Sequence, residues 1–410
     1  MRKRLVPILG AVALAAIVTG CSSPSSPTGS PTAAADGETI KIALIPPASG
    51  ALAEHGTNAV RGWELAVDMV NAEGGINGQL VELVEKSTDA TPETTVRAAR
   101  EAVTRDGAQF IGAVMTSPEH GALNQQLANL GALSFNSLGK DDALIGAQCS
   151  ANAFHIVQTT RMDINALATT LADLPAERWA IQAVDYATGH TAAEVFTAAA
   201  EEAGKEVVLT QFAPLNTTDF GSYITTLQQS DADGLFAVEF GADGTNFVKQ
   251  AEQFALTDKF DTVLGFNMVS EPLFEAMGPG ILVFYNNVGY DVSGTEELNT
   301  EFVEAYTEKF GEAPYYVPAD NFLAAQTLFA GIEAAGSADP EAVSEALNDL
   351  TFDSIVGEVT LRGADHQLVR PSYLGQVVES EDGPGGLGFE IRAEAAGEDI
   401  TPEPDPACSI

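Results

Sequence analysis

Basic residues are scarce in this sequence. Its 410 residues include 19 Lys and Arg against 58 Asp and Glu, which gives a net charge of −39. Nucleic acids and anionic lipid surfaces repel a chain with this charge, so we exclude both as partners. The charge says little about a ligand, because most of these carboxylates are expected on the solvated outer surface.

Cysteine is also scarce. The three cysteines are Cys21, Cys149 and Cys408, and neither they nor the histidines have a metal-type spacing, so the sequence predicts no metal site and no cofactor. If Cys21 has the separate role described below, Cys149 and Cys408 remain as a pair. In an oxidising compartment they could form a disulfide that holds the C-terminal tail. Two separate, inert thiols are the alternative.

Recognisable catalytic motifs are absent. The sequence contains no G-x-S-x-G and no HExxH, and the adjacent Glu54 and His55 do not by themselves make a catalytic pair. We therefore predict that the protein is not an enzyme. An exported enzyme is the alternative, and recovery of an unchanged ligand after incubation would exclude it.

The N-terminus is typical of an exported lipoprotein. Three basic residues precede the apolar run Leu5–Val18, which is too short to span a bilayer as a mature helix. The following Val18-Thr19-Gly20-Cys21 looks like a bacterial lipobox, whose cysteine becomes the lipidated N-terminus. Residues 1–20 are then a signal peptide and residues 21–37 a flexible tether. Cys21 would anchor the protein to the outer face of the cytoplasmic membrane without spanning it. A signal peptide with a chance cysteine is the alternative.

From residue 38 onward, short apolar segments alternate with amphipathic ones. This alternation predicts an α/β fold of mostly parallel sheets with helices on both faces. It starts again near Asn152, which indicates two lobes. Near the C-terminus, a strand is expected at Ile281–Phe284, hairpin strands are expected at Gly357–Leu361 and Tyr373–Val378, and residues 393–410 form an acidic, Pro-rich tail.

The segment Gln109–Gly121 combines a strand with a helix start. Gln109–Val114 is apolar enough for a buried parallel strand. Ser117 can then cap a helix, and Pro118 suits its first position. Free N–H groups at such a junction, together with the hydroxyls of Thr116 and Ser117, could hold a carboxylate. An ordinary strand-to-helix turn with a good cap is the alternative.

Ordered features from Glu38 to about Val378 resemble the leucine/isoleucine/valine-type solute-binding proteins of ABC importers. The features that carry the resemblance are Ser49-Gly50, Gly56, the helix end Asn71-Ala72-Glu73-Gly74-Gly75-Ile76-Asn77-Gly78, Asp89-Ala90-Thr91-Pro92, Ile111-Gly112, Gly189 and Phe302–Gly311.

The resemblance implies two doubly wound parallel-sheet lobes joined by hinge strands, the type I periplasmic binding protein fold. Lobe 1 would comprise residues 38–156 and 289–354, and lobe 2 residues 157–288 and 355–392. It also implies a monomer that closes on a small-molecule ligand, without covalent chemistry, and delivers it to an ABC permease. The alternative is an envelope ligand sensor of the same fold, which neighbouring permease and ATPase genes would argue against.

The resemblance further implies two ligand-binding loops in lobe 1. The loop Val114–Ser117 would hold the ligand carboxylate, with Thr116 as a hydroxyl donor. In the second loop, Ser137–Lys140, Lys140 either strengthens anion binding or points to solvent. The full set of expected ligand-binding residues is His55, Met115, Thr116, Ser117, Leu138, Lys140, Thr188, Phe240 and Asn267.

Several of these positions depart from the family pattern. His55 stands where an aromatic residue often lines the cleft, and Thr188 stands where Tyr is common. Asn267 replaces the carboxylate that holds the ammonium group in branched-chain binders, and an amide lacks that charge. Glu239 could substitute, but it precedes Phe240 on a strand, where adjacent side chains face opposite ways. An amino acid, an amide, a hydroxy or keto acid and an aromatic acid all stay open as ligands.

Overall fold

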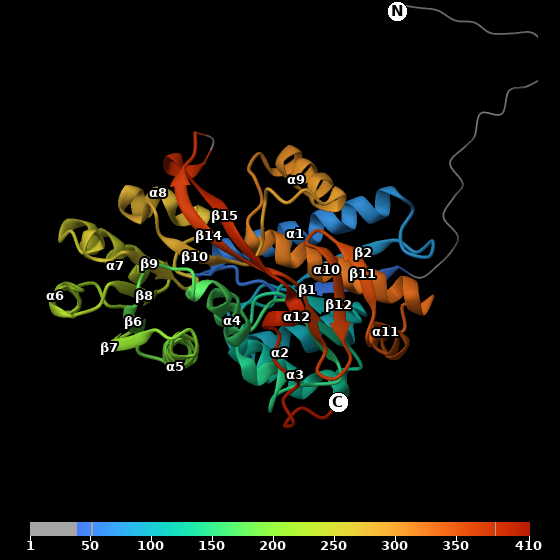
Figure 1. Ribbon diagram of the computed structural model, residues 1–410. Helices are drawn as coiled ribbons and strands as arrows, with labels where there is room; N and C mark the ends of the chain where they lie inside the picture. Colours follow the sequence, from blue (N-terminus) through green and yellow to red (C-terminus); the bar gives the residue numbers. More distant parts are fainter. Residues whose placement is uncertain (1–38, 51, 382) are drawn as a thin grey trace, which may run out of the picture.

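The computed structural model describes residues 39–50, 52–381 and 383–410, which form two lobes (Figure 1). The predicted signal peptide, Cys21 and the tether lie outside these residues. Each lobe has a central sheet with helices on both of its faces, and the expected α/β fold of two doubly wound lobes is confirmed.

The first lobe is built on an eight-stranded sheet of order β11-β12-β13-β5-β4-β3-β1-β2. Ile42 faces a core with Trp63 of helix α1, while Ala43 faces a second core with Leu123 of helix α3, because successive side chains in a strand point to opposite faces. The strands are β1 (Ile40–Leu44), β2 (Val81–Glu85), β3 (Phe110–Gly112), β4 (Leu133–Asn136), β5 (Ala153–His155), β11 (Thr351–Ser354), β12 (Gly357–Arg362) and β13 (Gln367–Val369). The helices are α1 (Ala53–Ala72), α2 (Pro92–Glu101), α3 (Ser117–Leu130), α9 (Glu297–Phe310), α10 (Tyr316–Ala335) and α11 (Pro340–Leu347), with a π turn η1 (Ala102–Asp106) and a 3-10 turn η2 (Asp142–Ile145).

The second lobe is built on a seven-stranded sheet of order β15-β14-β10-β9-β8-β6-β7. Its strands are β6 (Arg178–Val184), β7 (Glu206–Ala213), β8 (Gly234–Val238), β9 (Thr262–Gly265), β10 (Tyr285–Val288), β14 (Ser372–Glu379) and β15 (Leu387–Ala395). Its helices are α4 (Thr160–Leu171), α5 (Ala187–Glu202), α6 (Gly221–Gln229), α7 (Gly241–Gln253), α8 (Phe274–Met277) and α12 (Gly397–Ile400), with 3-10 turns η3 (Thr257–Lys259), η4 (Glu271–Leu273), η5 (Gly278–Ile281) and η6 (Pro384–Gly386).

Three segments carry the chain from one sheet to the other. They connect β5 to α4, β10 to α9, and β13 to β14. In Figure 1 the part of the second lobe from α4 to α8, green to yellow, lies to the left of the first lobe, and the long red strands β14 and β15, which complete the second sheet, run along the junction. The three connections form the hinge between the lobes.

The C-terminal third differs from the sequence-based division. Residues 355–369 were expected in the second lobe, but β12 pairs with β11 and β13 pairs with β5 of the first sheet. The tight turn between β11 and β12 keeps both strands in one sheet. The expected hairpin of Gly357–Leu361 with Tyr373–Val378 is therefore wrong, because these segments belong to different sheets.

Two smaller differences concern residues 281–284 and the tail. The strand expected at 281–284 is wrong, because the strand of this region, β10, starts at Tyr285. A 3-10 turn, η5, precedes it, because Gly278-Pro279-Gly280 favours a turn. In the expected tail, β15 continues to Ala395 and α12 follows at once.

Candidate functional site

The candidate site lies where the parallel strands of both sheets end. Loops leave the carboxyl ends of β3 and β4 in the first lobe and of β6, β8 and β9 in the second. Ligands of open α/β sheets bind at this edge, because the loops and helix N-termini there present unpaired backbone groups.

Thr116, and not Ser117 as expected, is the N-cap of α3. Its backbone N–H and its hydroxyl both donate to Oε2 of Glu119, at 2.9 and 2.8 Å, and its Oγ1 accepts from the Glu119 N–H at 3.4 Å. Glu119 is fully buried, and its other oxygen accepts from the hydroxyl of Thr95. This capping box uses the only hydroxyl proton of Thr116 within the helix start. The Thr116 hydroxyl can therefore accept from a ligand more readily than it can donate to one.

Ser117 occupies the first turn of α3 beside the β4 loop. Its Oγ accepts a hydrogen bond from the Asp141 N–H at 3.1 Å, so its own proton stays available for an acceptor. Met115, which precedes the cap, is 6% exposed and packs in the core of the first lobe. Of the two hydroxyls expected to bind a carboxylate, Ser117 has the better geometry as a donor.

The buried amide of Asn136 shapes the β4 loop. Its Oδ1 accepts from the N–H groups of Leu138 and Gly139, and its Nδ2 donates to the Gly139 carbonyl at 2.7 Å and lies 2.9 Å from Nδ1 of His155. Burial lowers the pKa of His155 to about 3, so its ring is neutral at physiological pH. The loop that carries Lys140 is therefore held by an uncharged network of hydrogen bonds.

Lys140 forms an ion pair that bridges the two lobes. Its Nζ lies 2.6 Å from Oδ2 of Asp163, which is fully buried in α4. Asn267 of the β9 loop also approaches this oxygen, with its Nδ2 at 3.5 Å. Asn267 is held in turn by two hydrogen bonds with Asn287. The ammonium group of Lys140 and the amide of Asn267 are thus both engaged with protein partners.

The second lobe contributes an aromatic pair. The rings of Tyr186 and Phe240 lie 6.3 Å apart with a tilt of 48°. Burial raises the pKa of Tyr186, and a hydrogen bond with Thr188 opposes the increase. His55 lies apart from this pair, in the first turn of α1. Its Nδ1 is buried without a hydrogen-bond partner in the described part of the chain, and burial lowers its pKa although Glu54 opposes the decrease.

A small cavity of about 40 Å³ opens between the lobes beside the hinge. Of the expected site residues, only Lys140 and Asn267 line it. Its lining comprises Lys140, Asn267, Val269, Ser270, Glu271, Asn286, Asn287, Val288, Gly289, Tyr290, Tyr316 and Phe389. A larger, open hollow of about 1080 Å³ lies at the opposite ends of the strands, beside Lys41 and Gln109 near the starts of β1 and β3. We favour the smaller cavity as part of the site, because residues of both lobes meet there.

Asp163, Glu271, Asn287 and Tyr316 were not predicted from the sequence. Asp163 and Asn287 lie within regular elements, where nothing in the sequence marks them as different from other polar residues. Glu271 stands in Ser270-Glu271-Pro272, which is typical of an ordinary helix start. Among the described residues, no cluster of His, Cys, Asp and Glu could hold a metal ion, and no helix is long and apolar enough to cross a membrane.

Comparison with known proteins gives one consistent family. Residues 39–384 match the periplasmic binding protein family. A curated relative, Leu/Ile/Val-binding protein homolog 7 of Brucella melitensis, is 26% identical over 333 residues, which cover 77% of this chain and 82% of the relative.

Two solved structures have the same fold. The leucine-, isoleucine-, valine-, threonine- and alanine-binding protein of Brucella ovis, in its closed conformation, superposes with a TM-score of 0.81 at 20% identity, over 91% of this chain and 99% of the other. A solute-binding protein of an ABC transporter from Rhodopseudomonas palustris BisB5, in complex with 3,4-dihydroxybenzoic acid, gives 0.77 at 21% identity, over 88% and 98%. Since the family match extends through both lobes, this chain belongs to the periplasmic binding protein family.

Proposed function

We propose that this protein is the extracytoplasmic solute-binding component of an ABC importer. It would close its lobes around a small polar solute, an amino acid or a related carboxylate or amide, and present it to a permease. The observation that carries the proposal is the cavity lined from both lobes beside a hinge of three connections. A solute that contacts both lobes stabilises the closed state through its greater affinity for that state.

The relatives limit the ligand class only partly. The Brucella ovis structure is named for aliphatic and hydroxylated amino acids, and the Rhodopseudomonas palustris structure holds a dihydroxybenzoic acid. The same fold thus accepts solutes with and without an ammonium group. The ligand of this chain has to be argued from its own cleft residues.

The membrane attachment is a separate part of the proposal. Lipid on Cys21 would hold the protein, as a monomer, at the outer face of the cytoplasmic membrane near its permease. Labelling of the wild-type chain by a radioactive fatty acid, and no labelling of Cys21→Ser, is the expected result. Equal labelling of both proteins would contradict the anchor.

A thermal-shift screen of residues 22–410 tests the binding function. The panel would contain amino acids, amides, hydroxy acids and aromatic acids, together with a small-molecule extract of the growth medium. A solute at about 100 times its Kd adds about 2.7 kcal/mol to the free energy of unfolding if it binds only the native state. A bound solute should be recovered chemically unchanged. If no probe and no extract component raises the melting temperature, the proposal fails.

A further inference from the structure

The acid Glu271 lines the inter-lobe cavity and lacks a side-chain partner. It begins the three-residue turn η4 of the second lobe, directly after Ser270. Tyr316, the first residue of α10 in the first lobe, and Tyr290 of the hinge connection line the same cavity. Among the described residues, no hydrogen bond or ion pair joins the Glu271 carboxylate to another side chain.

Two fully buried acids at the lobe junction, Asp163 and Asp320, are compensated by cations. Asp163 has the ammonium group of Lys140 at 2.6 Å, and Asp320 has the guanidinium of Arg370 at 2.5 Å. Glu271 is half-buried, and its carboxylate has only a hydrogen bond to its own backbone; the partial loss of water around it raises its pKa to about 7. No basic side chain contributes to lowering this pKa. Glu271 is therefore the carboxylate of the cavity that lacks a cation.

The surroundings of Glu271 suit a cation from outside the protein. A carboxylate that is partly removed from water, as Glu271 is, is stabilised by a cation beside it. Tyrosine rings also attract cations through their negative faces. Glu271, Tyr290 and Tyr316 line the same cavity, and burial, with a smaller contribution from nearby carboxylates that include Glu271, raises the pKa of both tyrosines.

We propose that Glu271, between Tyr290 and Tyr316, binds an ammonium or substituted ammonium group of the solute. This inference rests on the proposed function and names its ligand class: an amino acid or another solute with a cationic nitrogen. A cavity of about 40 Å³ exceeds the roughly 10–15 Å³ that a single water molecule requires, so it has room for a small cationic group. The cationic group fits there, and the rest of the solute extends toward Ser117 and the strand ends.

This assignment resolves the question raised by Asn267. The amide at this position cannot hold an ammonium group by charge, and its Oδ1 already accepts from Nδ2 of Asn287 at 2.9 Å. Glu271 follows four residues later on the same loop and supplies the missing carboxylate from another direction. A cationic solute held by Glu271 would also contact Tyr316, so binding would join the two lobes.

The test compares Glu271→Gln with Glu275→Gln, which makes the same replacement at an exposed acid of α8. Binding is measured by calorimetry with L-leucine, L-phenylalanine and glycine betaine, with the 2-hydroxy acids that match the two amino acids, and with any solute isolated from the medium extract. We expect a solute with a cationic nitrogen to bind, and its hydroxy analogue to bind at least about tenfold more weakly. Glu271→Gln should weaken the binding of the cationic solute by about the same factor, which is about 1.4 kcal/mol. Glu275→Gln should bind like the wild type.

Each other outcome decides between the two proposals. If the bound solute has no cationic nitrogen, or if Glu271→Gln binds the cationic solute as tightly as the wild type, the role of Glu271 is refuted and solute binding stands. If no probe and no extracted solute binds the wild-type protein, the proposed function itself is refuted and the inference falls with it. Circular dichroism melting of both variants confirms that each is folded.

A second inference rests on a separate feature, the C-terminal segment 396–408. Its first part is fixed to the second lobe: Ile400 packs with Ala166 of α4, and Nδ2 of Asn165 donates to the Ile400 carbonyl at 2.9 Å. Its last part is fixed to the first lobe, where Arg362 of β12 donates to the Pro402 carbonyl at 2.7 Å. This last part also contains Cys408, which is covalently linked to the first lobe.

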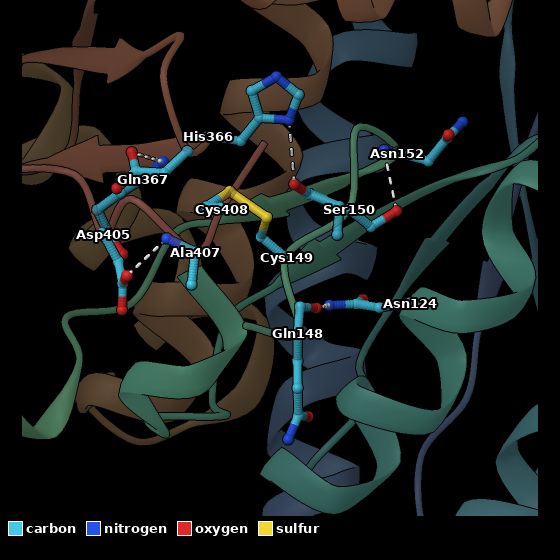
Figure 2. The surroundings of a disulfide bond; sticks show 12 residues. Asn124, Gln148, Cys149, Ser150, Asn152, His366, Gln367, Asp405, Ala407 and Cys408 are labelled. Atoms are coloured by element: carbon cyan, nitrogen blue, oxygen red, sulfur yellow. Dashed lines mark hydrogen bonds between the residues drawn. A yellow bond between two sulfur atoms is a disulfide. The ribbon is translucent and has the colours of Figure 1, made fainter. Parts of the chain in front are cut away.

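That link is the disulfide between Cys149 and Cys408, whose Cα atoms lie 5.6 Å apart (Figure 2). Cys149 belongs to the connection from β4 to β5 in the first lobe, and Asp405 turns the chain toward Cys408 by accepting from the Ala407 N–H at 2.8 Å. We infer that residues 396–408 form a disulfide-closed strap, a fourth covalent connection between the lobes, which limits how far they separate. Gly397 lies close to the Arg370 backbone, because a Cβ added to Gly397 would lie 2.6 Å from the Arg370 N atom. This close approach places the strap against the third hinge connection.

Small-angle X-ray scattering of the ligand-free protein tests the strap. We expect the double variant Cys149→Ser/Cys408→Ser to have a larger radius of gyration than the oxidised wild type, and the wild type to approach it after reduction. Lower thermal stability alone would also follow from a purely structural disulfide, so the size of the folded protein is the deciding measurement. An equal radius of gyration in all three samples, at a temperature where all are folded, would refute the strap.

Discussion

The fully buried carboxyl of Glu239 gives the protein a pH-dependent stability. Glu239 follows β8, and its Oε1 accepts a hydrogen bond from Nε2 of Gln182 at 2.8 Å, while its Oε2 has no partner in the described part of the chain. Burial, and to a lesser degree the charge of Asp243, raises its pKa to about 7, and the Gln182 bond opposes the increase. The folded protein therefore keeps a proton that the unfolded chain has already lost.

The variant Glu239→Gln should remove this dependence. Below pH 4.5 both states of the wild type are protonated and the two proteins are expected to be equally stable. Between pH 4.5 and 7 the wild type loses stability relative to the variant as pH rises, and above pH 7 the difference stays constant. At about 1.4 kcal/mol for each pKa unit, the variant is more stable at pH 8 by roughly 3 kcal/mol.

Urea unfolding of both proteins at pH 4.5 and pH 8 measures the effect. Glu308→Gln, which changes an exposed acid of α9, is the matched control and should follow the wild type at both values. A wild type that is as stable as Glu239→Gln at pH 8 would show that the buried carboxyl has a partner we have not identified.

At the residue scale, the sequence predicted where the site residues lie better than it predicted their hydrogen bonds and ion pairs. It placed Thr116, Lys140 and Asn267 in the loops at the strand ends, where the structure has them. It did not predict that the Thr116 proton is used by Glu119 or that Lys140 pairs with Asp163, because such partners depend on the distance between segments far apart in the chain. Glu271 was missed for the same reason, since its isolation is a property of the folded cavity.

Among the elements, helix α3 depends on its capping box. Thr116→Ala removes the acceptor for the Glu119 N–H and leaves the buried Glu119 with one donor fewer. We expect a loss of about 1 kcal/mol in the free energy of unfolding, the usual cost of an N-cap replaced by alanine. Thr116→Ser keeps the hydroxyl and should retain most of this free energy.

Equilibrium urea unfolding distinguishes these variants, and the solute found in the screen adds a second measurement. Because the Thr116 hydroxyl proton is engaged within the helix start, we expect Ser117→Ala to weaken solute binding more than Thr116→Ser does. The reverse order would indicate that the capping box opens when solute binds, with Thr116 as the donor. Equal stability of Thr116→Ala and the wild type would contradict the capping role.

The sequence also predicted the elements better than their pairing. Alternating apolar segments indicated the central strands and helices of both lobes, because burial on both faces leaves a continuous apolar run. Strands β12 and β14 have similar strand-like sequence patterns, but they belong to different sheets. Their assignment depends on the chain crossing the hinge between β13 and β14, at Arg370 and Pro371, and no composition change marks that point.

For the molecule as a whole, the net charge of −39 opposes folding. Carboxylates spread over the surface repel one another, and a compact state brings them closer together than an unfolded chain does. Salt shortens the reach of this repulsion from about 30 Å at 0.01 M to about 3 Å at 1 M. Salt also weakens ion pairs, but most ion pairs of the described residues have an exposed partner and contribute little.

The melting temperature at pH 7.5 should therefore rise when sodium chloride is increased from about 0.01 M to about 0.5 M, because screening of the repulsion outweighs the loss of surface ion pairs. The control is the same titration near pH 4, where many carboxylates are neutral and the repulsion is small. There the rise should be much smaller. A melting temperature that falls with salt at pH 7.5 would mean that bridges such as Lys140–Asp163, rather than the overall repulsion, dominate the electrostatic stability of the two-lobed protein.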